Sequence, residues 1–143
     1  KVRYSSTIRI IHSDEHITFR HSTTILDVHH YPCPAMNIFE RKFVNVLGEY
    51  GGIGLPVEGH TWIIERKWGY GGNKKNAEEV MKQYEDFLDM LKVFVQTGCA
   101  AAVYTQTTDV EGEVNGLMTY DRKIVKLDID RLRHINTIVI NSL

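Results

Sequence analysis

The amino-acid sequence predicts an α/β fold in which parallel strands alternate with helices. Three short apolar runs have the composition of buried strands, and apolar residues recur at helical spacing in the long segment between the second and third runs. Parallel strands need long crossover connections, usually helices, and they are apolar on both faces because helices cover the sheet. The 143 residues fit one domain of roughly 100 to 200 residues, so a single core is expected.

The N-terminal half supplies the first two predicted strands. Residues 1–22 alternate only loosely, and we expect an irregular extended arm or a weak hairpin there. Residues 23–29 form a short apolar run followed by prolines, which is typical of a buried strand that ends in a loop. Residues 43–48 form the second run, and several glycines follow it. We therefore predict a second buried strand that leads into a turn-rich loop.

The C-terminal half supplies a helix, a third strand and a last helix. Between residues 73 and 97 apolar side chains recur every three or four positions, Asn76 offers an N-cap and Gly98 a C-terminal stop, which predicts a long amphipathic helix. Residues 99–105 form a third apolar run, predicted to be a buried strand whose small alanines let its neighbours approach closely. Residues 122–132 return to apolar spacing and are predicted to be a last helix with a frayed end.

The expected architecture is part of a (β/α)8 barrel. Three parallel strands are too few to close an eight-stranded barrel, which typically takes about 250 residues. We therefore predict an incomplete barrel over residues 23–143, preceded by the irregular arm of residues 1–22, and expect the chain to be a portion of a longer protein. An incomplete barrel exposes open sheet edges, which invite self-association unless they are covered.

The composition disfavours several kinds of partner and compartment. Seventeen Lys and Arg against 18 Asp and Glu give a formal net charge of -1, so a nucleic acid is not an expected partner. The longest strongly apolar stretch, residues 99–104, is much shorter than the roughly 20 residues needed to cross a bilayer, and no membrane partner is expected. Cys33 and Cys99 match no paired zinc or redox spacing and are either free thiols or one disulfide. The sequence does not decide the compartment, and a periplasmic or secreted location is among the options.

Polar and aromatic residues gather where the predicted strands end. In barrels of this type catalytic groups lie at the carboxyl ends of the strands and in the loops that follow, so these residues are the candidates for a functional site. Their mixture of carboxylates and rings suits a sugar, whose C–H faces stack on aromatic rings while its hydroxyls bond to polar side chains. The candidates are Asp27, His29, His30, Tyr31, Glu49, Tyr50, His60, Trp62, Tyr104, Gln106, Asp109, Glu111 and Glu113.

Other kinds of site fit these residues less well. His29 and His30 are adjacent on a strand and point to opposite faces, so they do not readily meet one metal ion. Residues 109–120 resemble a calcium loop only in part, because Tyr120 occupies the position of the bidentate Glu. The glycines after the second strand lack the spacing and the Lys of a phosphate loop. Glu49 also has a structural alternative, a solvated or salt-bridged strand end, and composition alone does not decide between the two.

Three stretches carry a more specific signal. DVHHYPCPAM (residues 27–36), VLGEYGGIGLPVEGHTW (46–62) and AAVYTQTTDVEGEVNGLMTYDR (101–122) resemble the last three strand ends of the catalytic barrel in glycoside hydrolase family 2, in particular its bacterial β-galactosidase-like members. The resemblance covers residues 23–132 and implies the last three βα units of a TIM barrel. It implies an enzyme that hydrolyses terminal β-galactosides, and no metal or cofactor is expected.

The resemblance also assigns roles to individual residues. It implies a retaining glycosidase with two carboxylates, and Glu49 falls on the position of the nucleophile. Tyr31 resembles the tyrosine that lies beside the nucleophile, where it could hydrogen-bond to the carboxylate and keep it charged. His29 or His30 would face sugar hydroxyls. The other residues expected to bind the substrate are His60, Trp62, Tyr104, Gln106 and Asp109, and those expected to shape the last loop are Glu111, Glu113 and Asn115.

One part of the family's machinery is missing from this sequence. The acid/base of the family lies in an Asn-Glu pair on an earlier strand, and no Asn-Glu dipeptide occurs here. General acid catalysis is typically worth roughly 10²- to 10⁴-fold in rate. We therefore predict that this chain alone has negligible hydrolase activity and that it belongs to a longer retaining exo-glycosidase.

Three alternatives stay open at the level of the sequence. A β-glucuronidase or β-mannosidase relative fits the same three stretches. A non-catalytic carbohydrate-binding or assembly module would keep the sugar-lining residues without the reaction, and its sugar affinity would survive Glu49→Gln. A metal protein built around His29, His30 and Cys33 would be revealed by metal analysis.

Overall fold

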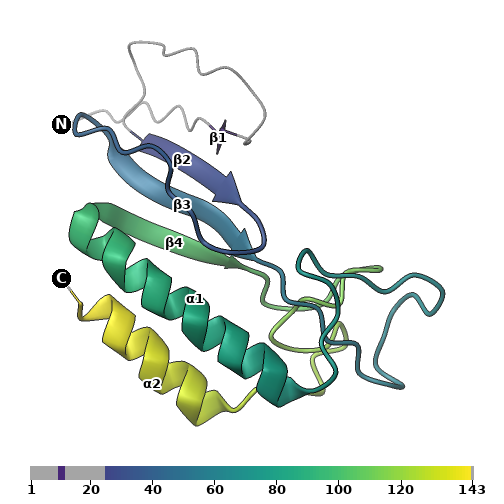
Figure 1. The fold of residues 1–143 in the computed structure, drawn as a ribbon. Coiled ribbons are helices and arrows are strands. Elements are labelled where there is room, and N and C mark those ends of the chain that lie inside the picture. The colour runs from purple at the N-terminus through teal and green to yellow at the C-terminus, as the bar shows by residue number, and fades with distance from the viewer. Residues whose placement is uncertain (1–9, 12–24, 143) are drawn as a thin grey trace, which may run out of the picture.

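The computed structural model describes residues 10–11 and 25–142, which form an α/β fold around an open parallel sheet (Figure 1). The strands follow the order β1-β2-β3-β4, and each neighbouring pair is parallel. The elements are β1 (Ile10–Ile11), β2 (Ile25–His30), β3 (Val44–Gly51), α1 (Ala77–Thr97), β4 (Cys99–Thr105) and α2 (Ile129–Ile140). The predicted α/β class is confirmed, and the described residues do not close into a barrel.

The first two predicted strands are confirmed with shifted bounds. The arm predicted over residues 1–22 contributes β1, which pairs with β2, and otherwise lies outside the described residues. β3 continues past Gly48, because Tyr50 and Gly51 still pair with β4. Glu49 therefore lies within the last part of β3.

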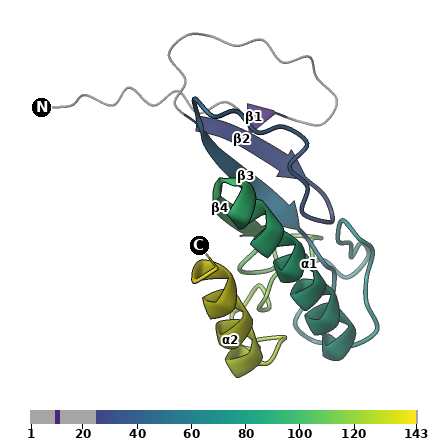
Figure 2. The same ribbon diagram turned by 60° about the vertical axis from the view of Figure 1, so that its left-hand side comes forward.

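Both helices lie on the same side of the sheet (Figures 1 and 2). Leu47 and Tyr50 project from β3 into the core that the sheet shares with α1 and α2. The apolar spacing that predicts α1 corresponds to its buried residues, which are Val80, Met81, Tyr84, Phe87, Leu88 and Leu91. Burying one large apolar side chain stabilises a protein by roughly 1.5 to 3 kcal/mol, so this face holds α1 on the sheet.

The two ends of α1 have the predicted caps. Asn76 has an extended backbone, and its side-chain oxygen accepts a hydrogen bond from the amide of Glu79 (2.9 Å). Gly98 follows the helix in the left-handed conformation (φ 111°), and its amide donates to the carbonyls of Phe94 and Val95. These contacts satisfy backbone groups that have no partner within the helix.

The third predicted strand has the expected bounds, but the prediction that it is buried is wrong. The four residues from Ala100 to Val103 are exposed, and 51 % of the surface of Val103 is accessible to solvent. The reason is the strand order, which puts β4 at the edge of the sheet. Within the described part of the chain, no further strand covers it.

The last helix begins later than predicted. α2 starts at Ile129, and the side chain of the N-cap Asp128 accepts a hydrogen bond from the amide of Arg131 (2.9 Å). Residues 122–128 are not helical, and Val125 forms an antiparallel bridge with Met118. The apolar residues before 129 therefore belong to an extended segment. α2 packs on the core through Leu132, Ile135 and Val139.

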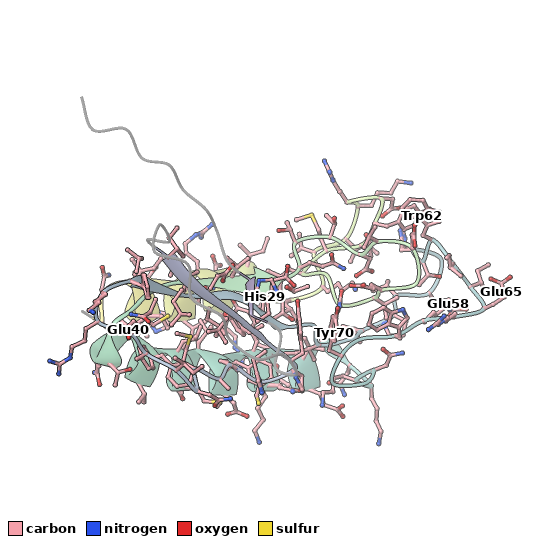
Figure 3. The ribbon with its side chains drawn as sticks, turned by 90° about the horizontal axis from the view of Figure 1, so that it is seen from above. His29, Glu40, Glu58, Trp62, Glu65 and Tyr70 are labelled. Atoms are coloured by element: carbon pink, nitrogen blue, oxygen red, sulfur yellow. The ribbon has the colours of Figure 1, made fainter. Side chains whose placement is uncertain are left out.

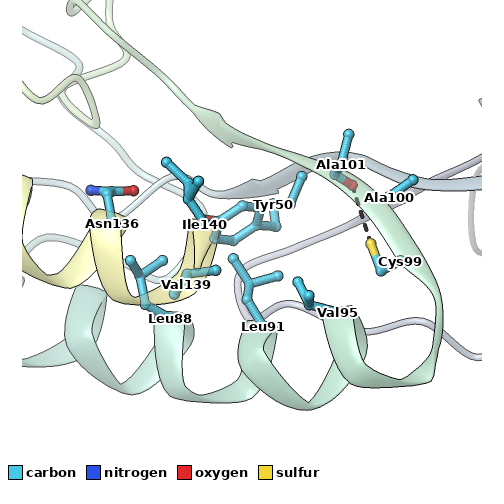
Figure 4. Close-up of a pocket in the computed structure, with 11 residues that line it drawn as sticks. Tyr50, Leu88, Leu91, Val95, Cys99, Ala100, Ala101, Asn136, Val139 and Ile140 are labelled. Atoms are coloured by element: carbon cyan, nitrogen blue, oxygen red, sulfur yellow. Dashed lines mark hydrogen bonds between the residues drawn. The ribbon is translucent and has the colours of Figure 1, made fainter. Parts of the chain in front are cut away.

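An apolar cavity of about 420 Å³ lies between α1, α2 and β4 (Figure 4). Its lining is mostly aliphatic, and none of the described residues that form it carries a carboxylate. Cys99 lies in this wall, where its thiol donates to the carbonyl of Ala101 (3.2 Å) and burial raises its pKa. Both cysteines are free, so the disulfide considered from the sequence is not formed.

Candidate functional site

The candidate site lies at the carboxyl ends of β2, β3 and β4, where the loops after the strands gather (Figure 1). Backbone hydrogen bonds join these ends: the amide of Gly51 donates to the carbonyl of Pro32 (2.8 Å), and the amide of Gly52 to that of Thr105 (2.7 Å). Gly51 has a φ of 100°, and a Cβ there would lie 2.4 Å from the ring of Tyr104. The chain therefore requires glycine at the last residue of β3.

A β-bulge turns Glu49 away from the helices. In a regular strand Glu49 would share a face with Leu47, which is completely buried in the core. The pairing with β2 shifts at this point and leaves Gly48 as the extra residue of β3. Tyr50 takes the core-facing position, with 3 % exposure, and Glu49 approaches His29 instead. Bulges commonly re-aim side chains next to functional sites.

Glu49 and Tyr31 are in direct contact. The phenol of Tyr31 donates a hydrogen bond to Oε2 of Glu49 and lies 2.9 Å from Oγ1 of Thr105. Burial, followed by the hydrogen bond to Glu49, raises the pKa of Tyr31, so the phenol is protonated near neutral pH and acts as a donor. The Glu49 side chain is 43 % exposed, so a ligand can reach its carboxylate. The contact that the family resemblance implies is therefore present.

His29 lies between two carboxylates. Its Nδ1 is 3.6 Å from Oε2 of Glu49, and its Nε2 is 3.5 Å from Oδ2 of Asp27. Asp27 is 9 % exposed, and its Oδ1 has no hydrogen-bond partner among the described residues. A Cβ on Gly48 would lie 1.9 Å from this oxygen, so the bulge glycine is what lets the carboxylate lie over β3.

Tyr70 forms an aromatic wall beside Tyr31, although it lies outside the three stretches that predict the site. The two rings are stacked, with centroids 3.8 Å apart and planes inclined by 12°. Trp68 meets the ring of Tyr70 edge-on at 5.2 Å. The amide of Tyr70 donates to the carbonyl of Gly52 (2.9 Å), which brings this loop back to the end of β3. Tyr70 is 43 % exposed and offers its ring to a ligand.

Gln106 belongs to a network of amides and a carboxylate after β4. Its Nε2 donates to Oδ1 of Asn115 (2.6 Å) and to Oε2 of Glu113 (3.0 Å), and Nδ2 of Asn115 donates to the same oxygen of Glu113 (3.2 Å). Asn115 is completely buried, and these bonds supply the partners that a buried amide requires. The network joins Gln106, expected to bind substrate, to Glu113 and Asn115, which were expected only to shape the loop.

Tyr104 and Asp109, which were expected to line the pocket, make contacts in the protein interior instead. Tyr104 packs edge-on against Tyr50 (5.6 Å) and Tyr84 (5.0 Å), and burial raises its pKa. Asp109 is 4 % exposed and forms an ion pair with Nζ of Lys126 (2.6 Å). Tyr104 is packed between other rings, and Asp109 is paired with a buried cation. Neither side chain is therefore available to a ligand at the site in this arrangement.

His60 and Trp62 lie on the loop after β3, and the structure does not bring them to Glu49. Figure 3 shows Trp62 near the outer end of the loops, far from His29. Its ring lies 6.0 Å from that of Tyr120, and Nδ1 of His60 is 2.9 Å from Oδ2 of Asp121. Both contacts join the loop after β3 to the loop after β4. The structure therefore places His60 and Trp62 against Asp121 and Tyr120 and not beside Glu49.

His30 has a different partner from His29. Its Nδ1 is 2.8 Å from the carbonyl oxygen of Cys33, so one ring nitrogen is used within the loop after β2. In the part of the chain that the structure describes, no group of three or more His, Cys, Asp and Glu side chains is arranged to hold a metal ion. The metal alternative thus has no ligand cluster among these residues.

Comparison with protein-family models and with curated proteins returned no match for this chain. Function is therefore inferred from the geometry of the site. A half-exposed carboxylate, a neutral phenol bonded to it and an exposed ring nearby can bind a hydroxyl-rich ring and present an oxygen nucleophile to it. No helix within residues 10–11 and 25–142 is long and apolar enough to span a membrane.

Proposed function

We propose that this chain supplies the nucleophile of a retaining glycosidase related to glycoside hydrolase family 2, with a terminal β-galactoside as the preferred substrate. The observation that carries the proposal is the contact between Glu49 and Tyr31 at the ends of two adjacent parallel strands. The carboxylate is reachable, accepts a hydrogen bond from a protonated phenol and lies beside His29. The preference for a galactoside rests on the sequence resemblance.

In the proposed reaction Glu49 forms a covalent intermediate. One of its oxygens attacks the anomeric carbon, the bond from that carbon to the leaving oxygen breaks, and a glycosyl ester forms. Water then attacks the same carbon and gives one proton to the second carboxyl group, which the first step left deprotonated. The ester bond breaks and Glu49 leaves as a carboxylate, so that two inversions retain the configuration. Tyr31 orients Oε2 through its hydrogen bond, and the ring of Tyr70 stacks on a face of the sugar.

The leaving oxygen requires a proton from a second carboxyl group. In retaining enzymes this group lies roughly 5 to 5.5 Å from the nucleophile. In the family that this chain resembles, the group belongs to an Asn-Glu pair that the sequence lacks. We infer that a βα unit outside this chain supplies it, and that the chain alone hydrolyses ordinary glycosides negligibly.

The proposed architecture is the last part of a (β/α)8 barrel. The parallel sheet with helices on one side and polar residues at its carboxyl edge supports this proposal, since barrels have helices outside and their sites at that edge. In a complete barrel a further parallel strand would pair with β4. The buried carboxylate of Asp27 would then face the barrel interior.

A fluorosugar with a good leaving group tests the nucleophile on this chain. 2-Deoxy-2-fluoro-β-galactosyl fluoride releases fluoride, which departs without a proton donor, so the first step does not need the missing acid. The anomeric C–F bond breaks as Glu49 forms its ester. We expect this ester to accumulate, to be detected by intact-mass spectrometry and to be located on Glu49 by peptide mapping, and we expect Glu49→Gln to abolish it.

Glu58→Gln is the matched control, because Glu58 is an exposed glutamate farther along the loop after β3 (Figure 3). This variant should be labelled as fast as the original chain. Labelling of a residue other than Glu49 would contradict the assignment. Galactoside binding without labelling, at an affinity that survives Glu49→Gln, would favour the non-catalytic carbohydrate-binding module.

A further inference from the structure

Glu113 places a second carboxylate beside the aromatic wall. Its backbone forms a bridge with Trp68, and the neighbouring residues add two hydrogen bonds: the amide of Trp68 donates to the carbonyl of Gly112 (2.9 Å), and the amide of Val114 donates to the carbonyl of Trp68 (2.9 Å). The loop after β4 is thereby fixed against the segment that carries Tyr70. Glu113 is thus held by backbone pairing.

The carboxylate of Glu113 is held by one oxygen. Nε2 of Gln106 and Nδ2 of Asn115 both donate to Oε2, at 3.0 and 3.2 Å. Among the described residues, Oε1 makes no hydrogen bond, and the residue is only partly buried. A carboxylate oriented through one oxygen can accept a hydroxyl hydrogen with the other. This group therefore has both the orientation and the access of a ligand-binding carboxylate.

Tyr70 lies close to both Glu113 and Glu49. Burial, followed by the charges of Glu113 and then Glu49, raises the pKa of Tyr70. The geometry agrees, because the backbone of Glu113 pairs with Trp68, whose ring meets that of Tyr70 edge-on at 5.2 Å. The ring also stacks on Tyr31, which is bonded to Glu49. An exposed ring is therefore close to two carboxylates.

We propose that Glu113 is a specificity-determining residue that accepts hydrogen bonds from sugar hydroxyls, and that the site selects neutral pyranosides over uronic acids. This inference rests on the proposed glycosidase function and names its substrate class. A sugar stacked on Tyr70 would offer hydroxyls to Glu113 and its anomeric carbon to Glu49. An anionic sugar would meet the like charges of Glu49, Glu113 and Asp27, and such juxtaposition disfavours binding.

The test compares Glu113→Gln with Glu111→Gln. Both variants remove one carboxylate from the same loop, but Glu111 is exposed and lies outside the network. Labelling is followed at increasing concentrations of 2-deoxy-2-fluoro-β-galactosyl fluoride and of the corresponding glucuronyl fluoride. We expect Glu113→Gln to weaken binding of the neutral reagent roughly 10- to 100-fold. The variant should therefore prefer the neutral over the anionic reagent by a smaller ratio than the original chain does. Its maximal labelling rate should change less than its affinity. Glu111→Gln should behave as the original chain.

Two results would overturn the role of Glu113: tighter binding of the glucuronyl reagent by the original chain, or unchanged affinity and preference in Glu113→Gln. Near-ultraviolet circular dichroism checks that the variant keeps its loop. If Glu113→Gln perturbs the fold, Glu113→Asp is tested in its place. Aspartate keeps the negative charge, but its shorter side chain moves the carboxylate oxygens away from the sugar. This variant should lose galactoside affinity and still disfavour the anionic reagent, and retained affinity would refute the proposal.

Reversible binding separates this proposal from the nucleophile. Saturation-transfer NMR with methyl β-galactoside reports binding without any reaction. If no reagent labels Glu49 but the galactoside binds and Glu113→Gln weakens that binding, the nucleophile is refuted and the role of Glu113 stands. If Glu49 of the original chain is labelled and Glu113→Gln changes neither the affinity for the galactoside nor the preference between the two reagents, the nucleophile stands and the role of Glu113 is refuted. If the original chain shows neither labelling nor binding, both proposals fail.

Discussion

Asp109 and Lys126 form a buried ion pair that fixes the loop carrying Glu113. Nζ of Lys126 is 2.6 Å from Oδ1 of Asp109 and also donates to the carbonyls of Leu55 (2.8 Å) and Val114 (3.0 Å). The side chains of Asp109 and Lys126 are 2 % and 1 % exposed. Burial raises the pKa of Asp109 and lowers the pKa of Lys126, although their mutual attraction acts in the opposite direction. One buried cation therefore joins three segments of the chain.

Lys126→Met should destabilise the protein by roughly 3 to 5 kcal/mol, because it leaves the Asp109 carboxylate buried without a cation. A carboxyl group whose folded-state pKa is raised contributes stability below its ordinary pKa of 3.8 and loses it as the pH rises through the folded-state value. Loss of the cation raises that pKa further. The deficit should therefore be largest near neutral pH and shrink on acidification, as measured by urea unfolding at a series of pH values.

The double variant Asp109→Asn/Lys126→Met is the control for this prediction. It has no buried carboxylate at position 109, so its unfolding free energy should lack the added pH dependence. Its total loss should also be smaller than the sum of the two single losses, because the two side chains interact directly. If the loss of unfolding free energy in Lys126→Met stayed constant with pH, the uncompensated Asp109 carboxylate would not be its cause.

Part of the site follows from the sequence because strand ends are local features. Glu49 and Tyr31 come at or next to the carboxyl ends of two apolar runs, and parallel neighbours bring such ends together. Tyr70 and Glu113 lie on irregular loops, where no regular spacing of apolar residues predicts their position. Backbone hydrogen bonds between the loops hold them in place. Even the direction of Glu49 depends on the bulge, for which Gly48 in a strand is the only local signal.

At the scale of elements, α1 is defined by local chemistry at both ends. Asn76→Ala should cost roughly 1 kcal/mol, because it removes the side-chain acceptor of the Glu79 amide. Gly98→Ala should cost roughly 1 to 2 kcal/mol, because alanine resists the left-handed conformation. A Cβ at Gly98 would meet nothing within 4 Å, so this loss is conformational and not a clash. Urea unfolding measures both losses.

Gln96→Ala serves as the control for the caps, because Gln96 is exposed in the last turn of α1 and alanine is a good helix former. It should change the free energy of unfolding by less than about 0.5 kcal/mol. The two cap losses should add, since the sites lie at opposite ends of the helix. A Gly98→Ala variant as stable as the original chain would refute the proposed role of the C-cap.

Elements whose surroundings depend on distant segments are less predictable from the sequence than α1. The apolar run of β4 has the composition of a buried strand, yet the strand order leaves it at the edge. The apolar residues around 124–127 have helical spacing, yet they lie in an extended segment that pairs with residues near Met118. In both cases tertiary neighbours, which a single sequence does not display, decide the outcome.

At the scale of the whole molecule, the sheet is covered unevenly. α1 and α2 lie on one side of it (Figures 1 and 2). The polar residues of the site lie at the carboxyl edge. The edge of β4 has the exposed residues Ala100 to Val103, and the apolar cavity lies beside it. Among residues 10–11 and 25–142 this edge of the sheet is unpaired, and such a parallel edge with small apolar side chains is a template for another strand. The same edge would meet the next strand in the proposed barrel.

We therefore expect this chain to self-associate through β4 when it is studied alone. Val103→Lys should reduce the association, because a charged side chain on an edge strand opposes pairing with a second strand. Met90→Lys is the matched control, since Met90 is an exposed apolar residue on α1, away from the edge. Analytical ultracentrifugation over a range of concentrations measures the effect. Monomeric behaviour of the original chain, or equal loss of association in both variants, would show that the edge of β4 is not the contact surface.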